Sequence, residues 1–195
     1  EFGSGGRELG KRLADALHVP CYDHQIIEMI ASEEGLNEEY VANVGEKCIE
    51  ASYPLTIGHR LAMMPLTVMD QTIRVASAQR ALLEKFATQG DCVIVGRCAD
   101  YILEDYKPYN IFVYADIESR LARCRAKGGK DASLTDKELI KKIQSIDKSR
   151  AQYYRFYSGR TWGDKRNYDL CINTSDRNIE KLAKAIAYTI NNAND

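Results

Sequence analysis

Apolar residues recur at helical spacing along much of this chain, and short runs rich in β-branched residues lie between the helical stretches. In the first such stretch, one face carries Leu9, Leu13, Ala16 and Leu17. This pattern predicts an amphipathic helix that follows Arg7 and ends before Pro20. Further helices are predicted after residue 23, from 37 to about 52, and over 70–89, 117–127, 135–157 and 179–190.

Polar residues mark the starts of several predicted helices. Asp23 and Asn37 are predicted N-caps, because their side chains can accept hydrogen bonds from the free N–H groups of a first helical turn. Thr135 and Glu138 have the spacing of a reciprocal capping box. In the long helix, the positions predicted to face the core are Ile73, Ala76, Leu82, Leu83 and Phe86. The prolines and glycine of residues 53–65 predict a loop.

Three short apolar runs predict fully buried strands, at residues 92–95, 111–115 and 169–173. Strands that alternate with helices form crossover units. The predicted fold class is therefore α/β, with a parallel sheet flanked by helices on both faces. In such sheets, ligands bind beyond the carboxyl ends of the strands.

Composition indicates one ordinary soluble domain. The chain has 195 residues, and 27 Lys and Arg against 28 Asp and Glu leave a net charge of −1. This balance gives no general attraction to nucleic acids or anionic membranes, so neither is an expected partner. The six cysteines form no C-x-x-C pair. Their placement favours reduced core thiols of a cytoplasmic protein over disulfides or a zinc site. No signal peptide or membrane-spanning apolar run is recognised.

A glycine-rich turn stands directly before the first predicted helix. It consists of Gly3, Ser4, Gly5, Gly6 and Arg7. Glycines let successive N–H groups turn toward a phosphate, and a helix N-terminus adds partial positive charge. The alternative is a flexible linker. The full pattern G-x-x-x-x-G-K-[ST] is not met, because Gly6 stands where lysine belongs. A phosphate loop normally follows a strand, so either a first core strand precedes residue 1 or this is not such a loop.

Charged and aromatic residues supply further candidates. Arg97 and Asp100 follow the first predicted strand at its carboxyl end, where an arginine can bind phosphate through two hydrogen bonds. The alternative there is a solvated loop with a surface ion pair. Later helices and joints carry Arg120, Arg123, Arg125, Arg150, Arg155 and Arg160. Arginines on a flap can neutralise a transferring phosphoryl group, but many are simply exposed. The aromatic residues at 153–157 and Trp162 can stack a base or form core.

Five segments carry a wider resemblance: EFGSGGRELGKRLA (1–14), VPCYDHQII (19–27), CVIVGRCADYIL (92–103), NIFVYADIESRLAR (110–123) and SRAQYYRFYSGRTWGDKRNYDLCINTS (149–175). Together they resemble the cytidylate kinase-like family of P-loop nucleoside monophosphate kinases. The resemblance covers almost the whole chain in order and is weakest from about 35 to 70. It implies one kinase domain with a P-loop-type parallel sheet, a nucleoside-monophosphate-binding insert at about 35–70 and a lid at about 128–165.

The resemblance also implies roles for individual residues. Residues 3–7 would form the phosphate loop for ATP, with Arg7 in place of the missing lysine. Asp23, Arg97 and Asp100 would lie on the acceptor side.

Arg123 and Arg150 would belong to the lid and stabilise the transition state. The resemblance implies phosphoryl transfer from ATP–Mg²⁺ to a nucleoside monophosphate, CMP or dCMP first, and identifies no metal ligand. Because Gly6 and Glu8 replace the family's usual lysine and Ser/Thr, two alternatives stay open. One is a non-catalytic nucleotide-binding or regulatory module on the same fold. The other is a kinase of another small molecule.

Overall fold

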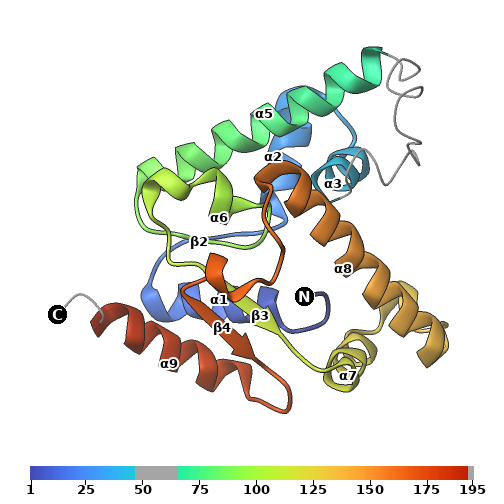
Figure 1. The fold of residues 1–195 in the computed structure, drawn as a ribbon, viewed down its shortest axis with the longest axis vertical. Helices are drawn as coiled ribbons and strands as arrows, with labels where there is room; N and C mark the ends of the chain where they lie inside the picture. Colours follow the sequence, from blue (N-terminus) through green and yellow to red (C-terminus); the bar gives the residue numbers. More distant parts are fainter. Residues whose placement is uncertain (47–65, 193–195) are drawn as a thin grey trace.

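Helices dominate the computed structural model, which describes residues 1–46 and 66–192 (Figure 1). The α-helices are α1 (Gly6–Leu17), α2 (Gln25–Glu34), α3 (Glu38–Glu46), α5 (Leu66–Gln89), α6 (Ala99–Ile102), α7 (Ile117–Lys127), α8 (Asp136–Ser158) and α9 (Ile179–Asn192). Short 3₁₀ helices are η2 (Glu104–Tyr106), η3 (Gly129–Asp131) and η4 (Lys165–Asn167). The strands are β1 (Cys21–Tyr22), β2 (Val93–Ile94), β3 (Ile111–Tyr114) and β4 (Leu170–Asn173). The loop predicted at 53–65 lies outside the described residues, as does the predicted end of the third helix.

The strands form two parallel pairs. β1 pairs with β2, with Cys21 opposite Val93, and β3 pairs with β4, with Ile111 opposite Leu170. The α/β class is confirmed, whereas within the described residues the strands do not join into one P-loop-type sheet. Two details of the strand prediction are wrong. β1 was not predicted, because two residues carry no periodic signal, and the strands are only partly buried.

The edge of β3 that faces away from β4 makes a contact with the start of the chain. The Val113 carbonyl accepts a hydrogen bond from the Glu1 amine at 2.8 Å. Neighbouring carbonyls of the same strand, at Asn110 and Tyr114, accept from the β4 side instead. The segment that leads into the glycine-rich turn therefore begins against this edge of β3. The core strand expected before residue 1 stays a prediction.

Two hydrophobic clusters hold the helices in place. One joins α2, α3, α5 and α6 around Ile26, Ile30 and Leu83. The other joins α1 and α9 to one face of the β3–β4 pair, around Leu9 and Ile172. Helix α1 also lies close to β2, because a Cβ added at Gly10 would be 2.7 Å from a Val95 methyl group. The first turn of α1 is thereby placed near the ends of both strand pairs.

Local capping decides where several helices begin. The predicted cap at Asn37 is confirmed, because its side chain accepts from the Glu39 N–H at 2.8 Å. The Thr135–Glu138 capping box is confirmed as well. The predicted cap at Asp23 is wrong: His24 precedes α2 without any side-chain cap, and the Asp23 carboxylate is taken by an ion pair with Arg7.

The predicted core face of α5 is confirmed at Leu82, Leu83 and Phe86, which are buried. Ile73, also predicted to face the core, is 56% exposed. Polar Thr72 and Gln79 are buried instead, with Val75 between them. Gln79 has specific partners that are described below. Apolar spacing alone could not reveal that these polar residues are buried.

The five described cysteines are free, and Cys98 is the buried one among them. The prediction of core thiols is therefore right for Cys98 and wrong for exposed Cys171. Cys48 lies outside the described residues. Across 1–46 and 66–192, no helix combines the length and apolar character needed to cross a bilayer.

Candidate functional site

The glycine-rich turn forms a tight loop that leads into α1. Gly3 and Gly5 adopt positive φ angles of 80° and 86°, and Gly5 is the N-cap of the helix. The first bond of α1 runs from the Leu9 N–H to the Gly5 carbonyl at 2.9 Å. Within the described residues, the N–H groups of Gly3, Gly5, Gly6 and Arg7 have no hydrogen-bond acceptor. Open N–H groups at a helix N-terminus form a site for an anion such as phosphate.

The floor of this loop is closely packed. Ser4 is fully buried, and its hydroxyl donates to the Glu1 carbonyl at 2.8 Å. The Ser4 carbonyl accepts from the Thr174 hydroxyl at 2.6 Å, just beyond β4. A Cβ at Gly3 would lie 3.1 Å from both the Arg120 carbonyl and the Cys124 sulfur. A side chain at Gly3 would therefore meet α7 as well as the strain of its positive φ.

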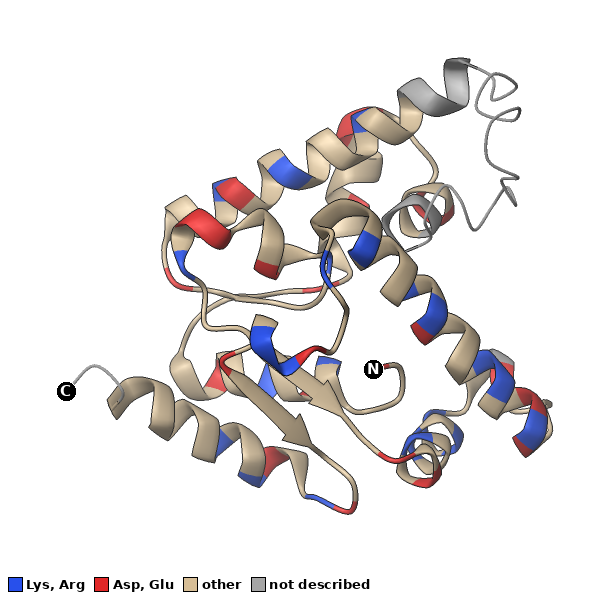
Figure 2. Ribbon diagram, viewed as in Figure 1, with Lys and Arg blue, Asp and Glu red and all other residues tan. Residues whose placement is uncertain are grey.

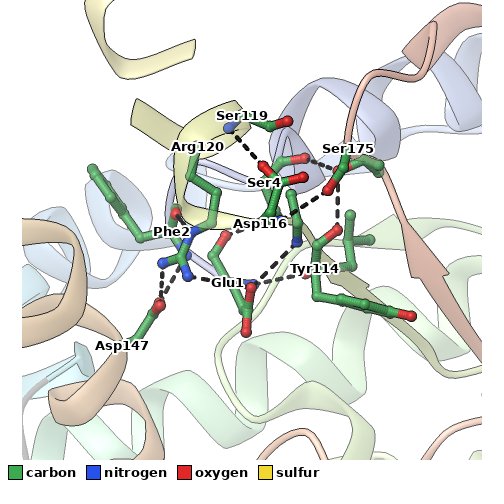
Figure 3. Close-up of polar contacts among 12 residues, drawn as sticks. Glu1, Phe2, Ser4, Tyr114, Asp116, Ser119, Arg120, Asp147 and Ser175 are labelled. Carbon is green, nitrogen blue, oxygen red and sulfur yellow. Dashed lines mark hydrogen bonds and ion pairs between the residues drawn. The ribbon is translucent and has the colours of Figure 1, made fainter. Parts of the chain in front are cut away.

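Arg120 contacts the start of the loop from α7 (Figure 3). Its side chain is nearly buried, and its Nε donates to the Phe2 carbonyl at 2.8 Å. The same guanidinium forms ion pairs with Glu1 and Asp147. Asp147, on α8, also accepts from the Phe2 N–H at 2.8 Å. Arg120 thus connects the start of the loop to α7 and α8. The sequence did not distinguish this structural role from those of the other arginines on the helices.

Arg123 and Arg150, predicted in the lid, both lie against the loop. Arg123 donates to the Thr174 carbonyl and, at 3.4 Å, to the Ser4 carbonyl. Arg150, on α8, lies 5.7 Å from the centre of the Phe2 ring, within the range of a cation–π contact. The structure therefore brings both guanidinium groups to the phosphate loop.

Arg7 lies on the outer side of the same loop, with a side chain that is 63% exposed. Its guanidinium pairs with the carboxylate of Asp23, which follows β1. This pair joins the first turn of α1, on the predicted donor side, to a residue of the predicted acceptor side. Glu8, next along α1, pairs with Arg12 at 2.9 Å.

The turn after β2 has an unusual backbone. Gly96, Arg97 and Cys98 have successive positive φ angles of 77°, 61° and 55°, although two of them carry side chains. Such conformations cost energy in non-glycine residues and persist where surrounding contacts enforce them. The Arg97 carbonyl accepts from the Gln79 side chain at 3.2 Å.

Asp100, in the helix that follows this turn, faces α8. It accepts a hydrogen bond from the Tyr154 hydroxyl at 2.6 Å. Burial raises the pKa of the Asp100 carboxyl, and the Tyr154 bond opposes that shift in part. Burial and the hydrogen bond to Asp100 together raise the pKa of Tyr154 above its ordinary value. In this pair the Tyr154 hydroxyl is the donor and the Asp100 carboxyl the acceptor.

The predicted residues thus fall into two groups. The first, at the predicted phosphate loop, contains Gly3–Arg7, Asp23, Arg123 and Arg150. The second, at the turn predicted to bind the acceptor, contains Arg97 and Asp100 with their partners on α5 and α8. Helix α8 touches both groups.

The other arginines serve mainly to fix loops. Arg125 donates to the Leu134 carbonyl at 2.6 Å and pairs with Asp136, so it closes the joint between α7 and α8. Arg160 pairs with Glu104 at 2.6 Å. Figure 2 shows basic residues interleaved with acidic ones along α5 and α8.

Several of the aromatic residues have structural roles. Tyr153 and Tyr154 are buried, which supports the interpretation of a core beneath a loop. Phe112 of β3 packs edge-on against Trp162, with ring centres 5.4 Å apart, and against Tyr168 at 4.9 Å. These contacts hold the segment after α8 against the sheet.

Comparisons with known proteins identify the family of the chain. Residues 1–176 match the cytidylate kinase-like family. The chain belongs to this family. Its membership indicates kinase activity of the nucleotide kinase type. None of the curated proteins compared with the chain matches it. A crystal structure of an uncharacterized protein from Eubacterium ventriosum ATCC 27560 matches with a TM-score of 0.69 and 23% identity, over 98% of this chain and 94% of that one. That likeness concerns the fold alone.

Proposed function

We propose that this cytidylate kinase-like protein transfers a phosphoryl group from ATP–Mg²⁺ to a nucleoside monophosphate, with CMP or dCMP as the first acceptor to test. The observation that carries the proposal is the row of open N–H groups before α1. Phosphoryl transfer depends more on positioning and charge neutralisation than on covalent chemistry. A backbone cradle bordered by arginines supports such a role.

On the donor side, the amides of residues 3–7 would hold the β-phosphate. Arg7 would supply the positive charge that the absent lysine supplies elsewhere, since its exposed guanidinium can turn from Asp23 toward a phosphate. Arg123 and Arg150 would add charge from the inner side of the loop and from α8. We place the lid at about residues 128–165.

On the acceptor side, Arg97 would bind the phosphate of the monophosphate, and Asp23 and Asp100 would border it. Parallel strands place their carboxyl ends at one edge, and Asp23 directly follows β1 while Arg97 lies in the turn after β2. The monophosphate-binding insert is proposed at about residues 35–70, much of which lies outside the described residues.

Magnesium would enter with the donor phosphates. In residues 1–46 and 66–192, no group of three acidic, histidine or cysteine side chains is arranged to hold a metal. The Ser4 hydroxyl donates to Glu1 and is fully buried, so it does not fit a ligand role. Mg²⁺ is commonly held by substrate phosphates and water with few protein ligands, so no step is assigned to a protein-bound metal.

A coupled assay with ATP, Mg²⁺ and a panel of nucleoside monophosphates tests this function. Turnover with CMP or dCMP is expected, and Arg97→Ala should lower kcat/KM for the acceptor about 10- to 100-fold, as for a lost charge-assisted hydrogen bond. Arg74→Ala is the matched control, because Arg74, on α5, forms a surface ion pair with Glu34 of α2. Background turnover with every acceptor would reject the enzyme.

One feature favours a second candidate, a non-catalytic nucleotide-binding module. Arg7 is engaged by Asp23 and Arg123 by backbone carbonyls, so neither charge is aimed at a phosphate without rearrangement. Calorimetry separates the two candidates: tight nucleotide binding without turnover supports the module.

A further inference from the structure

We propose that Gln79 is a positioning residue. It fixes the backbone conformation of Arg97 and thereby places the Arg97 side chain to bind the acceptor phosphate. The inference rests on the proposed function for its kinetic consequence, whereas its structural part stands alone. Gln79 lies on α5, and Arg97 lies in the turn after β2. No motif of the sequence connects these two residues.

The first step is the strain in the turn. Arg97 and Cys98 both have left-handed φ angles, 61° and 55°. Each non-glycine residue in this conformation costs about 1–3 kcal/mol, and the conformation persists only where surrounding contacts enforce it. A contact that fixes the peptide between these two residues therefore decides whether the turn keeps this shape.

Gln79 makes that contact. Its Nε2 donates to the Arg97 carbonyl, which belongs to the Arg97–Cys98 peptide, at 3.2 Å. Gln79 is 2% exposed, on a helix face whose other buried members include Val75, Leu82 and Leu83. A buried amide is costly unless it is hydrogen-bonded. The bond to Arg97 thus accounts for a polar residue at this place.

Gln79 also contacts α8. The same Nε2 lies 3.2 Å from the Tyr153 hydroxyl. Tyr153 is buried, and that burial raises the pKa of its hydroxyl. A neutral phenol here is a stable acceptor for the amide. Gln79 therefore joins the Arg97 turn to the helix that also contacts the phosphate loop.

The consequence is specific to the acceptor. If the Arg97 peptide can rotate, the side chain leaves the carboxyl end of β2 at another angle. Acceptor binding should weaken, while the donor loop, which Gln79 does not touch, keeps its affinity for ATP. This pattern differs from that of general destabilisation, which lowers the active fraction and leaves both KM values unchanged.

Gln79→Leu tests the proposal, because it removes both donors at similar size. The acceptor KM should rise about tenfold, as for one lost buried hydrogen bond, with the ATP KM unchanged within about twofold. Tyr153→Phe keeps the Arg97 contact and should raise the acceptor KM less. Gln71→Leu, the same change two turns earlier on α5, is the matched control and should leave both KM values unchanged. Equal rises in the two KM values for Gln79→Leu would overturn the proposal.

A spectroscopic measurement keeps the inference separate from the kinase function. The amide ¹⁵N signal of Cys98 belongs to the peptide whose carbonyl Gln79 contacts. It should shift in Gln79→Leu and remain in place in Gln71→Leu. If Gln79→Leu does not fold, Gln79→Glu takes its place, since its carboxylate has the same size and cannot donate. An unmoved Cys98 signal overturns the positioning role, whereas absent turnover in the wild type overturns the proposed function alone.

Discussion

The phosphate loop and the acceptor turn reach unusual backbone conformations by opposite means. The loop uses glycines at Gly3 and Gly5, where a positive φ is cheap. The turn uses Arg97 and Cys98, where a positive φ is costly and must be enforced. In the loop the backbone N–H groups of Gly3, Gly5, Gly6 and Arg7 have no acceptor among the described residues, whereas in the turn a backbone carbonyl accepts a hydrogen bond from Gln79.

Each half of the candidate site is therefore sensitive to a different kind of substitution. The loop depends on the absence of side chains and on the packing beneath it. The turn depends on buried hydrogen bonds from α5 and α8. Substitutions that crowd the loop and substitutions that remove a buried donor should therefore separate the two halves.

The largest effect is expected for Arg120→Met. This change leaves the Asp147 carboxylate without its buried partner and removes a donor to Phe2. We expect a loss of about 3 kcal/mol in the free energy of unfolding, measured by urea denaturation. Arg166→Met is the control, because its pair with Asp164 is exposed and should contribute under about 0.5 kcal/mol. Equal losses would show that Arg120 does not secure the loop.

Gly3→Ala should come next, with a loss of about 2 kcal/mol from positive φ and crowding together. Its Cβ would lie 3.1 Å from a backbone oxygen of α7. Gly35→Ala is a matched control, since Gly35 has φ 63° and nothing within 4 Å of an added Cβ. It should lose only about 1 kcal/mol from the backbone alone. Calorimetry should show weakened ATP binding for Gly3→Ala and unchanged binding for Gly35→Ala, and equal effects on binding would refute the cradle.

On the acceptor side, Tyr154→Phe removes the hydrogen bond to Asp100. A buried carboxylate that loses a donor should cost about 1.5 kcal/mol at neutral pH. Because this bond holds the Asp100 pKa down, its loss should raise that pKa further. Tyr157→Phe offers the same chemical change on the same helix. The prediction fails if the two variants lose equal stability.

The pH dependence of Asp100 gives a smaller effect of defined sign. Its folded pKa lies above the ordinary value of 3.8, so the folded protein binds more protons than the unfolded chain in that window. Stability from this group is therefore present below pH 3.8 and is lost as pH rises through the folded pKa. Asp100→Asn should remove this part of the decline, as measured by urea denaturation from acid to neutral pH. A steeper decline in the variant contradicts the assignment.

The smallest effect on stability is expected for Arg7→Gln. An exposed pair such as Arg7 with Asp23 contributes under about 0.5 kcal/mol, so unfolding should barely change. Donor affinity should nonetheless fall, because the loop loses its exposed charge. Arg12→Gln removes a comparable charge one turn farther along α1 and should leave ATP binding intact. Equal ATP affinities in the two variants would remove Arg7 from the donor site.

Sequence alone predicted the glycine-rich turn before α1 better than the backbone of the turn at Arg97. Glycines before an amphipathic helix indicate open N–H groups directly, and the caps at Asn37 and Thr135 follow from local chemistry. The burial of Gln79 on α5 could not be predicted, because it depends on what Gln79 meets across the fold. The capping role of Asp23 was wrong for a similar reason, since Arg7 competes for its carboxylate.

The distance between the two halves of the candidate site is set by the number of residues between two contacts on α8. Asp147 meets Phe2 and Tyr154 meets Asp100. At 1.5 Å per residue, these two contacts lie about 10 Å apart along the helix, on nearly the same face. The helix therefore fixes the distance between the loop and the turn. Substituting its exposed residues keeps this distance. Inserting one residue between Asp147 and Tyr154 rotates the two side chains relative to each other about the helix axis by about 100°.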